Sequence, residues 1–479
     1  MRKVILSIVA LAIASVAMAQ DTGARKAVQV AQIPGSAAGA NTGESIQNGS
    51  ANAVEVRQAG TEQSTLTDQD GVANLARVMQ TGDVNGNQAL SGQLNLAEVE
   101  QTGFNNQSTI YQEGDFNNAM IDQNNDNDTA ANRAQIMQGV ADQAESNDAA
   151  IVQDGEDNSA YTLQTFDNSD ASTVQDGTGN ISEIDQNAGP EDSMGQFAIV
   201  TQTGNANESR VEQDNVGGSN ARNRAFASQF GDNNKAEQIQ EAEGSMGNRA
   251  QIDQGWDGSH IVSGTSFGRL LELTNFDSQI VNSIPNESST EAVAFQSQSG
   301  DDNDGLIAQA SSVAGSNNAA QIQDGNGNSG WISQSFYSVG GTENVGRQLQ
   351  TGDDNAAALN QDGADHASLQ DQWGDDNTSV VSQAGMGNNS NMFQVGAGSY
   401  GQTLQHGEFN VALLTQRDGQ SYTIRQNEGV FAPGVGGNQA DILQEGPLGT
   451  GTQNGFIQVT PQGVTAPHSV STFSLAPIN

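Results

Sequence analysis

The 479-residue chain contains no cysteine, only 5% aromatic residues, and 16 lysines and arginines against 57 aspartates and glutamates. The absence of cysteine excludes disulfide crosslinks and a cysteine-linked lipid anchor. The formal net charge of −41 argues against binding to nucleic acid or to anionic membranes, because phosphate contacts require lysine and arginine. Such an acidic balance suits a soluble precursor that must not associate too early.

Hydrophobic residues are also scarce, at 34% of the chain, and they stand at single positions rather than in long runs. A globular protein of this length would carry several apolar cores. Low hydrophobicity combined with a high net charge normally indicates disorder. The spacing of the glutamines argues against disorder here, because a disordered chain has no reason to keep a fixed period.

Glutamine recurs at every eleventh position in the stretch 344–416. Glycine follows most of these glutamines by two places, and asparagine, or less often histidine or serine, precedes them by six. The unit reads N-x-A-x-Φ-x-Q-x-G-x-x, in which Φ is most often Ile, Val, Leu or Thr. The glutamines are Gln350, Gln361, Gln372, Gln383, Gln394, Gln405 and Gln416, and the turn glycines include Gly352, Gly363, Gly374, Gly385 and Gly396. Such a period indicates a repeat protein.

The unit predicts an all-β solenoid. Its Asn, small, Φ and Gln positions alternate, so that in a strand their side chains share one face. Gly and the two residues after it form a turn, because Gly and Asn accept left-handed backbone angles. Two 11-residue half-repeats make a 22-residue rung, and stacked rungs make two parallel sheets with about 4.8 Å between rungs. We therefore expect a two-sheet, cross-β, amyloid-like solenoid of strand-turn-strand repeats, with inward Asn and Gln bonded along the axis.

The positions of the prolines support strands. All 8 prolines fall outside the units, as expected if the units are strands, since proline removes a hydrogen bond from a sheet. One unit buries a single aliphatic side chain worth ~1.5–3 kcal/mol, whereas ordering eleven residues costs on the order of 10–20 kcal/mol. A unit cannot fold alone, and its stability must come from stacking.

The start of the chain has the pattern of a secretory signal peptide, assigned to residues 1–19. Arg2 and Lys3 provide a positive start, residues 4–14 form a short apolar run, and residues 17–19 provide a small-x-small cleavage site. The run is too short to span a bilayer, which requires about 20 apolar residues. We expect a secreted protein whose mature chain begins at Gln20.

The rest of the chain divides into segments that follow the repeat unit and segments that do not. Residues 20–40 hold no unit and are rich in Ala and Gly, which predicts a flexible leader. Units occupy residues 41–256 and 298–446. Residues 257–297 form an irregular insertion with an apolar cluster, and residues 447–479 form an uncharged, proline-containing tail.

These units resemble the curlin repeat of curli subunits, S/N-x-A-x3-Q-x-G-x-x-N-x-A-x3-Q. The match is close in Asn95-Leu-Ala-Glu-Val-Glu-Gln101-Thr-Gly-Phe-Asn-Asn106 and from Gly352 to Gln361. The resemblance covers most of residues 41–446. It implies a secreted structural subunit that polymerises into extracellular amyloid fibres of a biofilm matrix and serves cell adhesion.

The resemblance also implies which residues and partners matter. The chain would pair with itself as a homopolymer, with an outer-membrane export pore, and with a nucleator or other curli-like subunits. The implied ladder positions are Asn95, Gln101, Asn106, Gln112, Asn355, Gln361, Asn377, Gln383, Asn388, Gln394, Gln405, Asn410 and Gln416. The chain departs from a typical curlin in its larger number of units, its interrupted register and its tail.

A β-solenoid rod that does not polymerise is the alternative function, either as an adhesin stalk or as a surface- or ice-binding protein. Threonine is too sparse for the flat, regular array that ice binding would use. No enzyme is expected, because the aspartates recur at turns instead of clustering in an aromatic-lined cleft. The histidines show no metal-ligand spacing, His366 occupies an Asn position of the unit, and the G-G-x-G-x-D nonapeptide of calcium-binding solenoids is absent. We therefore expect no catalytic residue, metal, cofactor, nucleic acid or small-molecule substrate.

Two further features are expected on the outer surface. Asp353 and Asp354 precede Asp375 and Asp376 by one rung, so that stacking brings their carboxylates within about 5 Å, and repulsion should raise their pKa values. Apolar residues also stand at outward positions near the C-terminal end, where we expect a stripe for lateral bundling or for a partner. The apolar residues are Leu349, Leu369, Val380, Phe393, Leu404 and Leu413.

Overall fold

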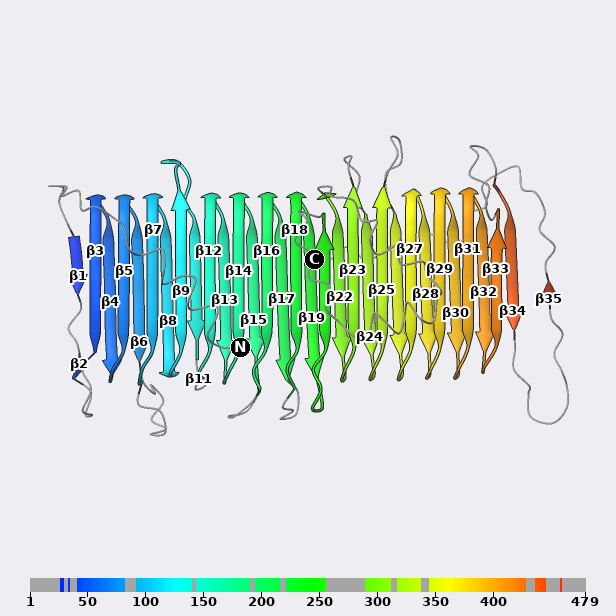
Figure 1. The fold of residues 1–479 in the computed structure, drawn as a ribbon, viewed down its shortest axis with the longest axis horizontal. Coiled ribbons are helices and arrows are strands. Elements are labelled where there is room, and N and C mark those ends of the chain that lie inside the picture. The colour runs from blue at the N-terminus through cyan, green and yellow to red at the C-terminus, as the bar shows by residue number, and fades with distance from the viewer. Residues whose placement is uncertain are drawn as a thin grey trace, which may run out of the picture.

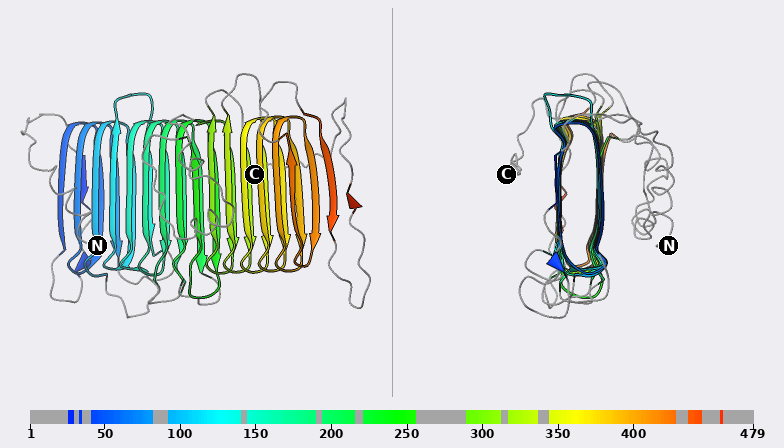
Figure 2. Two further views of the ribbon diagram at one scale, coloured as in Figure 1. Left: turned by 45° about the vertical axis from the view of Figure 1, so that its right-hand side comes forward. Right: turned by 90° about the vertical axis from the view of Figure 1, so that its left-hand side faces the viewer.

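The described chain forms two parallel β-sheets that face each other across a thin core (Figure 1). The computed structural model describes residues 26–29, 33–34, 41–81, 92–139, 144–189, 194–215, 221–255, 289–311, 317–336, 344–427, 436–444 and 457–458. Viewed along the axis, the rungs superimpose as one flattened loop (Figure 2). The fold is a β-solenoid, as the sequence predicts, and these residues contain no helix.

Consecutive strands alternate between the two sheets, here named sheet I and sheet II. Sheet I stacks β3 (Thr42–Ser50), β5 (Ser64–Val72), β7 (Leu96–Phe104), β9 (Asn118–Asn125), β12 (Asp148–Glu156), β14 (Asp170–Thr178), β16 (Phe197–Asn205), β18 (Arg224–Asp232), β20 (Arg249–Gln254), β23 (Asp304–Ser311), β25 (Ser329–Phe336), β27 (Ala356–Ala364), β29 (Thr378–Met386), β31 (Tyr400–Glu408) and β33 (Ser421–Gln426), with β21 (Ser289–Thr290) beside β18. Sheet II stacks β4 (Ala53–Gly60), β6 (Leu75–Thr81), β8 (Gln107–Asp115), β10 (Arg133–Gln138), β13 (Ser159–Thr165), β15 (Ile181–Asn187), β17 (Glu208–Asn215), β19 (Lys235–Ala242), β22 (Val293–Ser299), β24 (Asn318–Asp324), β26 (Val345–Thr351), β28 (Ala367–Trp373), β30 (Asn389–Val395), β32 (Val411–Arg417) and β34 (Gln439–Gln444). Four short strands complete sheet II: β1 (Lys26–Gln29), β2 (Ile33–Pro34), β11 (Ala144–Glu145) and β35 (Ile457–Gln458).

Neighbouring rungs align equivalent positions of the unit. Gln361 of β27 is in register with Gln383 of β29, one 22-residue rung further on. The register survives the insertions, because Gln254 of β20 still pairs with Gln309 of β23. Extra residues therefore enter between strands and leave the stack itself unchanged.

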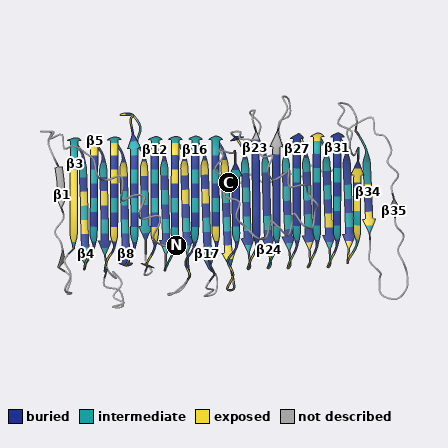
Figure 3. Ribbon diagram, in the orientation of Figure 1, coloured by how far each residue is buried: buried dark blue, intermediate teal, exposed yellow. Residues whose placement is uncertain are grey.

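The core is one side chain thick on each sheet and follows the predicted alternation. Asn355, Ala357, Leu359 and Gln361 are buried, with at most 1% of each residue exposed. The intervening Asn360 is half-buried on the outer face, whereas Ala358, also between inward positions, is buried. Figure 3 shows this alternation along the strands. In sheet I the Φ residues Ile307, Ile332, Leu359 and Val381 stack on one another as an apolar column.

The turns use the left-handed backbone conformation that the sequence predicts. Gly363 has a φ of 124° and Asp365 has a φ of 57°. A Cβ on Gly363 would collide with the carbonyl oxygen of Gly385 in the next rung. Glycine is needed here both for its backbone angle and for the close approach of successive turns.

The boundaries of the repeat region differ from the sequence prediction in two places. Part of the leader, predicted to be flexible, forms β1 and β2, which pair with β4. The solenoid resumes at Ser289 of β21, although the motif returns only at Gln298, because Ala292 and Gln296 occupy the Asn and Φ positions. The predicted signal peptide and most of the insertion and the tail lie outside the described residues.

Candidate functional site

One glutamine ladder runs through each sheet. Each Gln Nε2 donates a hydrogen bond to the Oε1 of the glutamine in the next rung, at 2.7–3.0 Å throughout. In sheet I the ladder joins Gln47, Gln69, Gln101, Gln123, Gln153, Gln175, Gln202, Gln229, Gln254, Gln309, Gln334, Gln361, Gln383, Gln405 and Gln426. In sheet II it joins Gln58, Gln80, Gln112, Gln138, Gln164, Gln186, Gln213, Gln240, Gln298, Gln323, Gln350, Gln372, Gln394, Gln416 and Gln444.

The same amides also tie the two sheets together. The Nε2 of Gln361 in sheet I donates to the carbonyl oxygen of Val345 in sheet II at 3.0 Å. The Nε2 of Gln372 in sheet II donates to the carbonyl oxygen of Ala356 in sheet I at 3.0 Å. Both amide protons are therefore used, which explains how a fully buried polar side chain is accommodated in the core.

A second ladder follows the asparagine position beside each turn. The Oδ1 of Asn355 accepts the backbone N–H of Asn377 at 3.0 Å, and its Nδ2 donates to the carbonyl oxygen of Gly374. Asn95 makes the same pair of bonds to Asn117 and Gly114. The asparagine therefore fixes the turn of the following rung, a role that glutamine at the strand end does not share.

The structure places every predicted ladder residue inward. Asn95, Gln101, Asn106, Gln112, Asn355, Gln361, Asn377, Gln383, Asn388, Gln394, Gln405, Asn410 and Gln416 are all at most 1% exposed. The five turn glycines have φ angles from 94° to 124°. Asn106 differs in one respect, since its buried Oδ1 has no hydrogen-bond partner. The asparagine ladder breaks before β10, whereas the glutamine ladder continues there from Gln112 to Gln138 at 3.0 Å.

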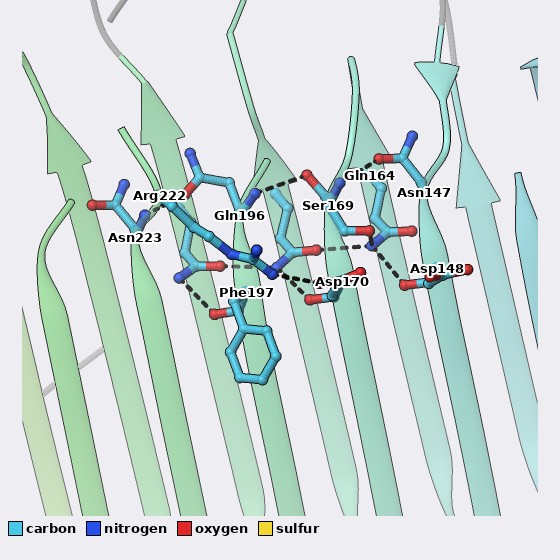
Figure 4. Close-up of polar contacts among 11 residues, drawn as sticks. Asn147, Asp148, Gln164, Ser169, Asp170, Gln196, Phe197, Arg222 and Asn223 are labelled. Atoms are coloured by element: carbon cyan, nitrogen blue, oxygen red, sulfur yellow. Dashed lines mark hydrogen bonds and ion pairs between the residues drawn. The ribbon is translucent and has the colours of Figure 1, made fainter. Parts of the chain in front are cut away.

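Other residues can carry the asparagine ladder, as Figure 4 shows. The backbone N–H of Ser169 donates to Asn147 Oδ1 at 2.7 Å, and that of Gln196 donates to Ser169 Oγ at 3.1 Å. The N–H of Asn223 then donates to Gln196 Oε1 at 2.9 Å. Any side chain that places an acceptor atom within hydrogen-bonding distance of the backbone N–H in the next rung can continue the ladder.

His366 is the most unusual of these substitutes. Its Nδ1 accepts the backbone N–H of Asn388 at 3.2 Å, and its Nε2 lies 3.2 Å from the carbonyl oxygen of Asp362. This arrangement requires a neutral ring with its proton on Nε2. Burial lowers the pKa of His366 to about 4, so the ring serves as a structural acceptor at neutral pH.

The sequence interpretation missed a further glutamine ladder at the Φ position. The Nε2 atoms of Gln238, Gln296, Gln321 and Gln348 donate to the next of these side chains, ending at Gln370, with distances of 2.8–3.0 Å. These residues replace the apolar column of sheet II from β19 to β28. The signal in the sequence is the pair Gln-x-Gln, which recurs at the end of each of these five strands.

The side chains of the turn aspartates accept hydrogen bonds from the backbone of the turn in the preceding rung. Asp375 Oδ1 accepts the backbone N–H of Asp353 at 3.0 Å, and Asp353 Oδ1 accepts the backbone N–H of Asn326 at 2.9 Å. Carboxylates also stack on the outer face of sheet I, where Asp68, Glu100 and Asp122 are in register on β5, β7 and β9. Partial burial raises the pKa values of all three. Repulsion adds to this effect, from Asp70 and Glu44 at Asp68, from Asp122 and Asp68 at Glu100, and from Asp154 and Glu98 at Asp122.

The expected outward apolar stripe is split between the two sheets. Leu349, Leu369, Phe393 and Leu413 lie on sheet II, whereas Val380 and Leu404 lie on sheet I. Phe393 is 40% exposed and Val380 is fully buried. The prediction of a single stripe is therefore wrong, because consecutive half-repeats belong to opposite faces of the solenoid.

The two ends of the solenoid are chemically different. All the bonds of the glutamine ladders point from the N-terminal to the C-terminal rung. In the described chain the ladders begin at Gln47 and Gln58, whose Oε1 atoms receive no ladder bond. At the other end of the described chain the ladders finish at Gln426 and Gln444, which accept ladder bonds and donate none. The N-terminal end thus offers acceptors and the C-terminal end offers donors.

Comparison with known proteins gives a family for the repeat. Residues 92–124 match the family model of the curlin associated repeat. This segment covers β7 and β8 and most of β9, and it includes four of the predicted ladder residues. No curated protein matches the chain. Within the described ranges, no helix is long and apolar enough to cross a membrane, and no group of three His, Asp or Glu side chains is arranged to hold a metal ion.

Proposed function

We propose that this chain, whose residues 92–124 match the curlin associated repeat, is a secreted structural subunit of curli-like extracellular amyloid fibres, with residues 1–19 as its signal peptide. Its principal partner is another copy of itself, stacked end to end. By its resemblance to curli subunits, an outer-membrane export pore and a nucleator or a second curli-like subunit are further proposed partners. In this proposal the fibre contributes to a biofilm matrix and to cell adhesion.

The one-way direction of the glutamine ladders supports this proposal most strongly. The C-terminal end presents the Nε2 donor of Gln426 in sheet I, and the N-terminal end presents the Oε1 acceptor of Gln47 in the same sheet. A second copy stacked in the same direction would continue the ladder without any change of geometry. This is a heterologous, head-to-tail contact that does not close on itself, which generates filaments and not rings.

The energetics also favour continued stacking. Each ladder bond contributes only about 0.5–1.5 kcal/mol net, but a new rung adds backbone hydrogen bonds along two strands together with burial of the end rung. An open strand edge is a template for further pairing. A solenoid without a closed end is therefore prone to polymerise.

The test begins with the purified chain from Gln20. On incubation we expect unbranched fibres in electron micrographs and a reflection near 4.7–4.8 Å in fibre diffraction. A chain that stays monomeric at high concentration while keeping its β-rich circular dichroism would overturn the proposal.

A matched pair of variants tests the role of the ladder at the C-terminal end. Gln426→Glu keeps an acceptor for Gln405 but removes the donor that would reach the next copy, and it should slow elongation. Gln402→Glu adds the same charge on the outer face of the adjacent β31 and should leave elongation close to that of the parent chain. Urea midpoints of both monomers would show whether the difference comes from the folded subunit itself.

A rod that does not polymerise remains the second candidate, and one observation favours it. Both ends of sheet II are covered by short strands from the chain's own leader and tail. Covered edges are a common device for preventing edge-to-edge association. On this reading the protein would be a stalk or a surface-binding rod, and the fibre assay above distinguishes the two.

A further inference from the structure

The N-terminal edge of sheet II is occupied by the leader. β1 runs parallel to β4, with Lys26 opposite Ala53 and Gln29 opposite Val56. β2 continues along the same edge, with Pro34 opposite Gly60. These strands take the place that the last sheet II strand of another copy would occupy. Pro34 has no N–H, so the covered edge offers one donor fewer for extension.

The C-terminal edge of sheet II is occupied by the tail. β35 lies against β34, with Ile457 opposite Leu443 and Gln458 opposite Ile442, and the pairing is antiparallel. Every other strand pair in the described chain is parallel. A rung of a second copy would have to approach β34 in the parallel orientation, and β35 fills part of that edge in the opposite one.

Sheet I has no such covering at either end of the described chain. β3 pairs only with β5, and β33 pairs only with β31. The first residues of β3 are exposed, from Thr42 to Ile46. The two sheets therefore end differently, although they carry the same repeat.

We infer that the edges of β4 and β34 are docking surfaces for a second copy of this chain that the leader and the tail hold closed. This inference rests on the proposed head-to-tail stacking. Copies first meet through sheet I, where β33 of one subunit meets β3 of the next. Sheet II completes the contact only when β1 and β2 leave β4 and β35 leaves β34. The displacement of these strands is the slow step of assembly, so the self-capped subunit stays soluble during export.

A reversible crosslink tests the leader cap. The chain has no cysteine, so Val28→Cys with Glu55→Cys introduces one pair at positions that are opposite each other on β1 and β4. Paired Cα atoms on neighbouring strands are close enough for a disulfide. The oxidised variant should show a severalfold longer lag and slower growth on preformed fibre ends, and a reductant should restore the parent rates.

A matched control uses the other neighbour of the same strand. Glu55→Cys with Arg77→Cys joins β4 to β6, which stay together whether or not the cap opens. It removes only the exposed Arg77–Glu55 ion pair at 3.6 Å, which contributes little. Oxidation of this pair should not change the lag.

The tail cap is tested by ending the chain at Gly446, which removes β35. We expect a severalfold shorter lag with the same fibre spacing. If the full chain forms fibres but neither the β1–β4 crosslink nor the shortened tail changes the rates, the capping inference is wrong and the proposed function stands. If no variant forms fibres under any condition, including the shortened chain, the proposed function itself fails.

Discussion

Gln254 and Gln309 lie 55 positions apart in the chain, yet Gln254 Nε2 donates a hydrogen bond to Gln309 Oε1 at 3.0 Å. The residues between them include the longest interruption of the repeat. Their strands β20 and β23 are nevertheless paired in register. The register is therefore set by the pairing of the two strands and of their ladder residues. The number of residues between two rungs has little influence on it. Loop-closure entropy grows only slowly with length, so a long insertion is tolerated at a turn.

Removal of one ladder amide should destabilise the subunit more than its size suggests. Gln383→Ala deprives Gln361 Nε2 and Gln405 Oε1 of their partners, and each buried unsatisfied group costs about 1–3 kcal/mol. We expect a loss of about 2–4 kcal/mol in the free energy of unfolding, measured by urea denaturation. Ser382→Ala, at the adjacent outward position, should change it by less than about 0.5 kcal/mol. Equal effects of the two variants would contradict the structural role of the ladder.

Substitutions in the Φ-position ladder should change the free energy of unfolding in a strongly non-additive way. Gln321→Leu alone deprives Gln296 Nε2 and Gln348 Oε1 of their partners and should cost about 1–3 kcal/mol. Replacement of all five glutamines by leucine removes every unpaired amide of the ladder, although it also removes the bonds of four of them to carbonyl oxygens of sheet I. Its total cost should therefore be smaller than the sum of five single costs. Urea midpoints of the single and the fivefold variant provide the comparison. Additive losses would show that these glutamines stabilise the fold in their own right.

His366 should make stability depend on pH in the mildly acidic range. Its folded pKa of about 4 lies below the unfolded value of about 6.5, so the unfolded chain binds the proton more readily. The stabilisation is complete above about pH 6.5 and is lost as the pH falls toward 4, by on the order of 3 kcal/mol. His366→Asn restores the consensus residue and should remove this loss. The difference in urea midpoint between the two chains should therefore change between pH 7 and pH 4.5, and a constant difference would disprove the assignment.

The outward carboxylates should have the opposite pH dependence. The pKa values of Asp68, Glu100 and Asp122 are raised by partial burial and then by repulsion from neighbouring carboxylates, so the folded state binds protons more readily than the unfolded chain. Their destabilising effect is present at neutral pH and disappears as the pH falls through the raised pKa values. Glu100→Gln should stabilise the subunit at pH 7 by less than about 1 kcal/mol, because the site is open to solvent, and should have no effect near pH 4. Glu62→Gln in an exposed turn is the control, and a benefit of Glu100→Gln that grows in acid would contradict this explanation.

Much of the site could be read from the sequence because the repeat leaves few choices. The spacing of eleven and the alternation within the unit predict which residues face inward, and Gln361 and Asn355 are indeed buried and stacked. The Φ-position glutamines were missed for a physical reason. A lone inward glutamine is unfavourable, so only the stacked partners Gln321 and Gln348 show why it is tolerated. The row of carboxylates at Asp68, Glu100 and Asp122 was also missed, because the sequence alone does not show which half-repeats stack on one another.

By itself, the sequence determined the period, the inward face and the turns, since these depend on residues close together in the chain. Only the tertiary structure decided which half-repeats share a sheet, and hence that Phe393 and Leu404 lie on opposite faces. It also decided what covers the ends, where β1 lies on β4 and the antiparallel β35 lies on β34. Neither strand follows the repeat, and no local pattern marks the edge to which it binds. An edge accepts whatever backbone reaches it, because the hydrogen bonds of a strand edge are independent of sequence.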